Sequence, residues 1–293
     1  MGLRELRGDA MSSWLEPEAP YERLRVTRFF VGLFATVYGL VRLPYLADFS
    51  RKAASSFMPA GPVVVLSKPL PPAATWALAL ATVALGAAFT LGRRLRIVAP
   101  AFFVSLAWTL SYANSWGKLL HSENLFLLHV GVLALAGERT DPKTSGWVLR
   151  TAAIVTVLAY LLAGITKLRN GGQAWLTGEA LGGWLAWDAL RKIELGSTAS
   201  PLAPFVAARP ALLQIFALYT LLVELGAPLA LVHARASRAW AMLAWGFHAG
   251  ILLTMWIGFF YPLSGVGLLS LLPAEKISEW SGRLRRRRAD AGS

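Results

Sequence analysis

The stretch YLLAGITKLRNGGQAW, residues 160–175, ends a long apolar run with a lysine and, eight residues later, a tryptophan. The run begins near residue 147 and reaches Lys167, so it has about the 20 residues that a helix needs to cross a bilayer. Lys167 therefore stands where the helix is still in lipid or is just leaving it. Two interpretations are open: the lysine snorkels to the interface, or it is an amine placed in an apolar pocket to accept a proton.

The rest of the chain has the composition of a membrane protein. Of its 293 residues, 56% are hydrophobic and 15% are charged, whereas a soluble domain has about 25% charged residues. The mean hydropathy is +0.51. We predict an all-α integral membrane protein with about eight transmembrane helices in the lipid bilayer. They lie near 28–47, 72–91, 95–113, 118–137, 147–167, 211–233, 238–257 and 259–274.

The distribution of Lys and Arg predicts the orientation of these helices. Basic residues gather before residue 28, at 93–96, at 139–150 and in the terminal segment. This pattern predicts a multi-pass protein with both termini cytoplasmic. The expected organisation is a cytoplasmic N-terminal segment at 1–27, a transmembrane domain at 28–274 and a basic cytoplasmic tail at 275–293. The outer loop from Lys167 to Arg209 breaks the charge rule, which invites a functional explanation.

The same loop contains AWLTGEALGGWLAWDAL, residues 174–190, which is apolar but too short to span a bilayer. It carries Trp175, Trp184 and Trp187, and tryptophan favours the membrane interface. We therefore predict an interfacial or re-entrant helix that caps the bundle at the outer face.

The net charge of +13 and the RLRRRR sequence at 283–288 match the pattern of a nucleic-acid patch. The basic residues lie mostly between apolar runs and at the ends, however, so we expect a tail on anionic lipid and no nucleic-acid partner. The absence of cysteine excludes disulfides and thiolate metal sites. The histidines show no close-spaced ligand set, and we predict no metal site.

Several ionisable residues lie inside apolar runs, where charge is costly. Glu224 must be neutral, paired or facing water, and His248 could pair with it, either as a packing contact or as a proton relay. His121 and His129 fall on nearly the same helix face, and the choice between interior packing and chemistry is open for both. Arg42, before a proline, is either a snorkelling residue or a functional one.

Two stretches resemble the membrane core of vitamin K-dependent gamma-carboxylases, the horizontally transferred transmembrane (HTTM) domain family. The first is AGITKL (163–168) followed by Trp175 and the Thr-Gly pair at 177–178, and the second is the Phe-His pair at 247–248 followed by IGFFYP (257–262). The His-Ser pair at 121–122 is a looser match. The family has a pair of lysines here; Thr166 stands where the family has the first, and Lys167 matches the second.

The resemblance implies a reduced, vitamin K-like quinone as cofactor, with Lys167 as the base that deprotonates it and His121 as a supporting catalytic group. It also implies that Trp175, Glu224 and His248 line the pocket for this lipophilic molecule. The chain ends soon after the last apolar segment, so we do not expect it to carboxylate glutamate in proteins.

Three functions therefore stay open. The first is a quinol-linked membrane enzyme, carboxylase-like or an oxidoreductase or lyase. The second is a non-catalytic binding protein or a transporter of protons or small solutes that uses Glu224 and His248. The third is a protein of the DoxX-like group, whose members carry a similar G-x-x-K-L stretch but have about half this length.

Overall fold

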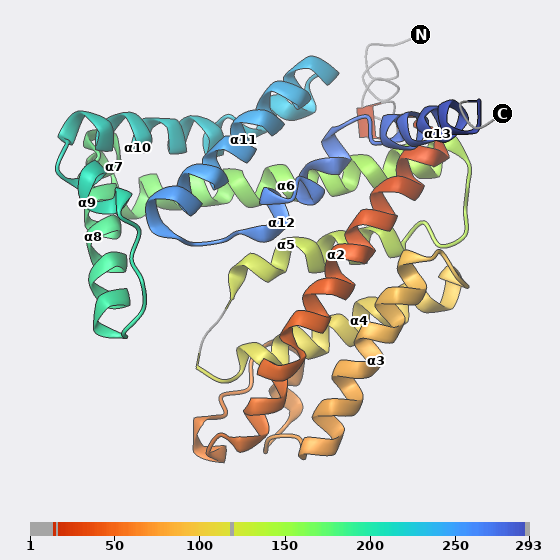
Figure 1. The fold of residues 1–293 in the computed structure, drawn as a ribbon, viewed down its shortest axis with the longest axis horizontal. Coiled ribbons are helices and arrows are strands. Elements are labelled where there is room, and N and C mark those ends of the chain that lie inside the picture. The colour runs from red at the N-terminus through yellow and green to blue at the C-terminus, as the bar shows by residue number, and fades with distance from the viewer. Residues whose placement is uncertain (1–13, 16, 118–119, 291–293) are drawn as a thin grey trace, which may run out of the picture. The chain divides into compact units, whose positions relative to one another are not determined.

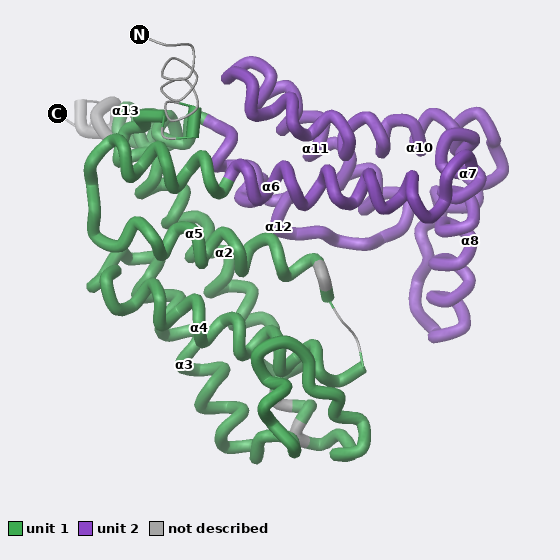
Figure 2. The backbone as a smooth tube through the Cα atoms, turned by 180° about the vertical axis from the view of Figure 1, so that it is seen from behind, with its two compact units in different colours: residues 1–152, 273–293 green, residues 153–272 purple. Residues whose placement is uncertain are grey.

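A computed structural model describes residues 14–15, 17–117 and 120–290 of the chain. Its regular elements in this part are all helices, so the predicted all-α class is confirmed. The chain divides into two compact units, residues 1–152 with 273–293 and residues 153–272 (Figure 2). We call them unit 1 and unit 2. Helix α6 contributes residues to both.

In the described part of the chain, the α-helices of unit 1 that follow residue 20 are, besides the first part of α6, α2 (Tyr21–Asp48), α3 (Pro72–Thr90), α4 (Leu95–Asn114), α5 (Asn124–Ala134) and α13 (Glu275–Asp290) (Figure 1). Helices α2, α3, α4 and α5 pack as successive neighbours. Between α3 and α4, Thr82 Oγ1 lies 2.6 Å from Ser105 Oγ and 2.8 Å from Thr109 Oγ1. Such hydroxyl contacts hold helices together where no water competes for them.

Unit 2 begins within α6 (Pro142–Gly171) and continues through α7 (Gln173–Thr177), α8 (Glu179–Glu194), α9 (Leu202–Ala207), α10 (Pro210–Leu225), α11 (Ala234–Met255) and α12 (Phe260–Leu263). Two 3-10 helices, η5 (Ala227–Leu231) and η6 (Val266–Leu271), follow α10 and α12. The core of unit 2 includes Val157, Tyr160, Val223, Trp240 and Ala244, from α6, α10 and α11.

Four helices are long and apolar enough to cross a membrane, judged by length and composition: Tyr21–Leu46 of α2, α3, α4 and α6. They expose apolar side chains, such as Val41 at 73%, Val104 at 63% and Leu162 at 58%. A water-facing helix surface would be polar, so these surfaces suit contact with lipid.

Of the other predicted spans, 238–257 corresponds to a long helix, α11, whereas the remaining three do not. Near 118–137 the helix α5 has 11 residues, and residues 118–119 lie outside the described part. Within 211–233 the helix ends at Leu225 and a 3-10 helix follows. The predicted helix at 259–274 is wrong: α12 has four residues and a six-residue 3-10 helix follows. Pro262 removes a backbone donor there, and Gly265 has φ +76°.

Candidate functional site

One face of α6 brings the lysine motif against the other helices of unit 2. Tyr160, Gly164 and Lys167 are spaced by four and three residues, so they lie one above the other on the same face. A Cβ atom on Gly164 would lie 2.9 Å from Cβ of Glu224. The missing side chain therefore lets α6 approach α10 closely at the level of the glutamate.

Lys167 and Glu224 form an ion pair. The Lys167 Nζ donates a hydrogen bond to Glu224 Oε1 at 2.5 Å, and the two side chains are 23% and 4% exposed. The expectation that Glu224 cannot stay unpaired is confirmed, because burying an isolated carboxylate is too costly. The sequence left two interpretations of Lys167 open, a snorkelling residue and a free amine in an apolar pocket. The structure shows a third arrangement, in which Lys167 is paired with a carboxylate.

Trp175 covers the ammonium group from α7. Its ring centroid lies 5.4 Å from Lys167 Nζ, within the range of a cation–π contact. The indole is buried against Ala217 and Leu221 of α10. A Cβ on Gly178, which has φ +85°, would lie 2.5 Å from the backbone nitrogen of Gln214, so glycine is required for the turn that brings α7 against α10.

The sequence suggested that His248 pairs with Glu224, but in the structure the partner of His248 is Tyr160. The Tyr160 hydroxyl lies 2.6 Å from His248 Nε2, and both side chains are buried. The ring of Phe259, from the IGFFYP stretch, lies 5.2 Å from the imidazole. Tyr160 lies two helical turns before Lys167 on the same face of α6. The contact with His248 that the sequence suggested for Glu224 is therefore made by this tyrosine.

Two polar atoms of this cluster have no hydrogen-bond partner within the described part of the chain. They are Glu224 Oε2 and His248 Nδ1, and both are buried. Buried polar atoms without partners are uncommon in proteins. They are the atoms of the cluster whose hydrogen-bonding capacity is unused in the described part of the chain.

The other predicted catalytic residue, His121, begins η4 in unit 1, and its side chain lies outside what the structure describes. Close to it in sequence, Glu123 is buried and pairs with Arg42 Nη2 at 3.4 Å. Tyr38 also donates to Glu123. Arg42 therefore holds a carboxylate, a pairing that the sequence reading missed. Among the described residues no group of His, Asp and Glu could hold a metal ion.

Part of the charge in the loop that breaks the charge rule is neutralised locally. Asp188 of α8 is buried and pairs with Arg191 at 3.0 Å and with Lys192 at 2.7 Å. Lys192 also donates to the backbone oxygen of Met255 at the end of α11. Together with Glu224, which pairs with Lys167, Asp188 therefore neutralises two of the positive charges that the loop carries.

An apolar cavity of about 360 Å³ lies in unit 2 between α8, α9, α10 and α11. Its walls include Phe216, Thr220, Phe247 and Ile251. Neither Lys167 nor Glu224 lines it. Thr220 lies one helical turn before Glu224, however, and Phe247 precedes His248, so the cavity and the charged cluster share two helices.

No protein-family model, no curated protein and no solved structure matches the chain. The resemblance to the carboxylase core therefore stays a prediction that rests on the quoted motifs.

Proposed function

We propose that the protein is a multi-pass membrane enzyme that acts on a lipophilic quinol and uses Lys167 as the base. The single observation that carries the proposal is the Lys167–Glu224 pair, whose carboxylate is 4% exposed. Such a pair can hold one proton on either partner, and intramembrane ionisable residues are a functional signal.

The chemistry that this chain can supply is proton transfer. When Lys167 Nζ gives a proton to Glu224 Oε1, the N–H bond breaks, an O–H bond forms, and the amine keeps its electron pair. The neutral amine can then accept a proton from an acidic hydroxyl. Trp175 covers the Lys167 side chain on one side and limits the access of water to it.

The residues fit a quinol as the substrate or cofactor. The apolar cavity has a volume in the range of small-molecule sites. Neither Lys167 nor Glu224 lines it, but Thr220 and Phe247 on its wall belong to the helices that carry Glu224 and His248, and Glu224 Oε2 has no hydrogen-bond partner in the described part of the chain. A bound quinol would supply the acidic hydroxyl. Membership of the HTTM group belongs to this proposal, whereas carboxylation of protein glutamate is not part of it.

The orientation also belongs to the proposal: both termini in the cytoplasm, and α8 as an interfacial helix at the outer face. The predicted eight crossings are not part of it, because residues 259–274 form no long helix. Trp184 and Trp187 of α8 are 53% and 55% exposed while Leu185 is buried. A helix with exposed tryptophans on one face suits the headgroup region.

The test is turnover of a reduced naphthoquinone by the purified protein in lipid nanodiscs, with oxygen and bicarbonate. We expect Lys167→Ala to lose at least 100-fold in turnover, the lower limit for a lost general base. Lys276→Ala, which removes an exposed lysine of α13, should keep the wild-type rate. An unchanged rate in a correctly folded Lys167→Ala protein would exclude Lys167 as the base.

The alternative is a proton or solute transporter. The unpaired buried atoms Glu224 Oε2 and His248 Nδ1 favour it, because such groups mark proton pathways in membrane proteins. In reconstituted vesicles this alternative requires a flux that Glu224→Gln abolishes. A protein that oxidises quinol but shows no such flux is the enzyme and not the transporter.

A further inference from the structure

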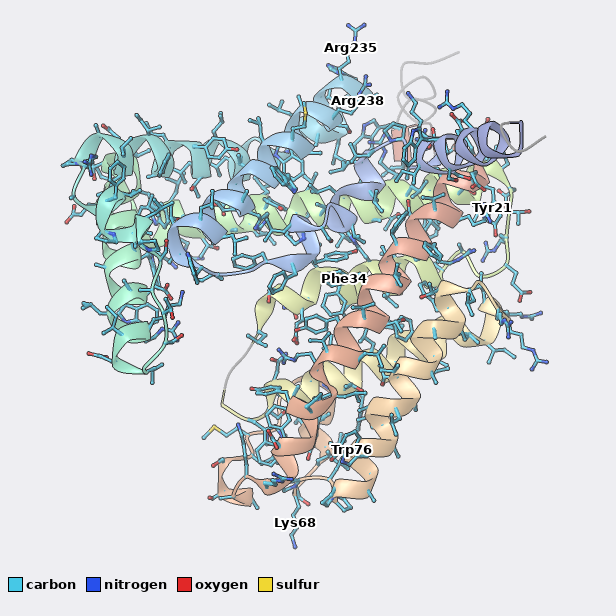
Figure 3. The ribbon with its side chains drawn as sticks, in the orientation of Figure 1. Tyr21, Phe34, Lys68, Trp76, Arg235 and Arg238 are labelled. Atoms are coloured by element: carbon cyan, nitrogen blue, oxygen red, sulfur yellow. The ribbon has the colours of Figure 1, made fainter. Side chains whose placement is uncertain are left out.

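A groove lies at one end of unit 1. It is separate from the Lys167 cluster, which belongs to unit 2. Its volume is about 610 Å³, and it is formed by the start of α2, the turn after α3 and the start of α13. Tyr21, which lines it, lies at the first turn of α2 beside α13 (Figure 3). The groove also includes Arg28, Thr90 and Ser278.

Arg28 is the unusual member of this groove. It is 6% exposed, its Nε is buried without a hydrogen-bond partner in the described part of the chain, and no carboxylate pairs with it there. The neighbouring arginines differ: Arg23 binds Glu275 at 2.6 Å, and Arg25 binds Glu22 at 2.7 Å. Of these three arginines on α2, Arg28 therefore holds the uncompensated charge.

A buried guanidinium cannot shed its charge, because arginine stays protonated in proteins. Without a partner such a charge destabilises the fold. The guanidinium packs closely against the turn after α3, since a Cβ on Gly92 would lie 3.2 Å from Arg28 Nη2. A buried cation whose Nε donor is unused in the described part of the chain, at the wall of an open groove, has the chemistry of an anion site.

The groove also has the chemistry of a lipid site. The guanidinium fork of Arg28 suits a phosphate group. Thr90 and Ser278 also line the groove, and the Thr90 hydroxyl donates to the backbone oxygen of Gly86. Beside them Phe29, Leu91 and Ile277 are apolar and 42%, 64% and 41% exposed. Because the groove is at the end of a candidate membrane span, a phosphate bound there can carry acyl chains along these apolar residues.

We propose that this groove binds the phosphate-bearing headgroup of an anionic membrane phospholipid and that Arg28 supplies the main charge. The basic residues of the same unit, including Arg93, Arg94 and Arg96 after α3, attract an anionic lipid more than a zwitterionic one. The proposal does not depend on the quinol chemistry of unit 2.

The test uses the full-length protein in mild detergent and measures the midpoint of thermal unfolding. Phosphatidylglycerol, phosphatidylcholine and inorganic phosphate are added separately. We expect phosphatidylglycerol to raise the wild-type midpoint by about 5 °C or more, because a ligand that binds only the folded state stabilises it. In Arg28→Gln this shift should be nearly lost. Lys68→Gln, which removes an exposed cation of the same unit that does not line the groove, should keep it.

A second readout separates binding from a structural role. Without anionic lipid, Arg28→Gln should be as stable as the wild type or more stable, since it removes an unpaired buried charge. Native mass spectrometry should find phosphatidylglycerol retained by the wild type and not by Arg28→Gln. Equal lipid shifts in both proteins, destabilisation of the lipid-free variant, or a full shift with inorganic phosphate alone would each overturn the proposal.

Discussion

Removing one partner of the Lys167–Glu224 pair should destabilise the protein strongly. Lys167→Met leaves the Glu224 carboxylate, which is 4% exposed, without its cation, and we expect a loss of about 4 kcal/mol. Glu224→Gln leaves an ammonium group whose side chain is 23% exposed. Because that group can still reach water, the expected loss is smaller, about 3 kcal/mol.

The double variant Lys167→Met/Glu224→Gln carries no charge at this position. Its free energy of unfolding should fall by no more than the loss of about 4 kcal/mol expected for Lys167→Met. Since the two single losses would add to about 7 kcal/mol, the coupling energy is about 3 kcal/mol. Denaturant unfolding of all four proteins in the same detergent measures this cycle. Effects that add to within about 0.5 kcal/mol would show that the two side chains do not interact, and the site described above would then be incorrect.

Three further predictions concern single contacts. Tyr160→Phe removes the partner of His248 Nε2 and should cost about 1–2 kcal/mol; unchanged unfolding and an unchanged imidazole NMR signal would contradict the contact. Gly164→Ala places a Cβ too close to α10 and should cost about 1–3 kcal/mol, whereas a stabilised variant would mean that the helices are farther apart. The Arg23 guanidinium holds the pKa of Glu275 below its ordinary value. The ion pair therefore contributes fully to the stability of α13 at pH values above the unfolded carboxyl pKa of about 4.3. This contribution is lost as the pH falls through the lower pKa of the folded state. The protection of the α13 amides against exchange, corrected for the intrinsic pH dependence of the exchange rate, should therefore fall on acidification in the wild type, and an identical protection profile in Arg23→Gln would refute the pairing.

The sequence was sufficient to predict the helical class and the need for a partner at Glu224. Apolar runs of about 20 residues and the cost of an isolated carboxylate are local properties, and they survive in any packing. The same reasoning failed near residues 259–274, where apolar composition suggested a helix. Local backbone breaks at Pro262 and Gly265 dominate there over composition.

The identity of the partners could not be predicted in the same way. Tyr160 raised no signal, because a tyrosine in an apolar run costs little, yet it takes the contact with His248 that was expected of Glu224. The spacing of Tyr160, Gly164 and Lys167 on one helix face was the available clue. Which helix meets that face depends on tertiary packing, as does the pairing of Arg42 with Glu123.

The central claim is that unit 2 binds a lipophilic quinol beside Lys167. The most direct test is photo-crosslinking of the nanodisc-embedded protein with a photoreactive quinol analogue, followed by mapping of the adducts by mass spectrometry. The account predicts adducts on α6, α10 and α11 near Lys167, Glu224 and His248, which unlabelled quinol removes by competition. Adducts confined to α2, α3 and α4, or adducts that unlabelled quinol does not reduce, would contradict it.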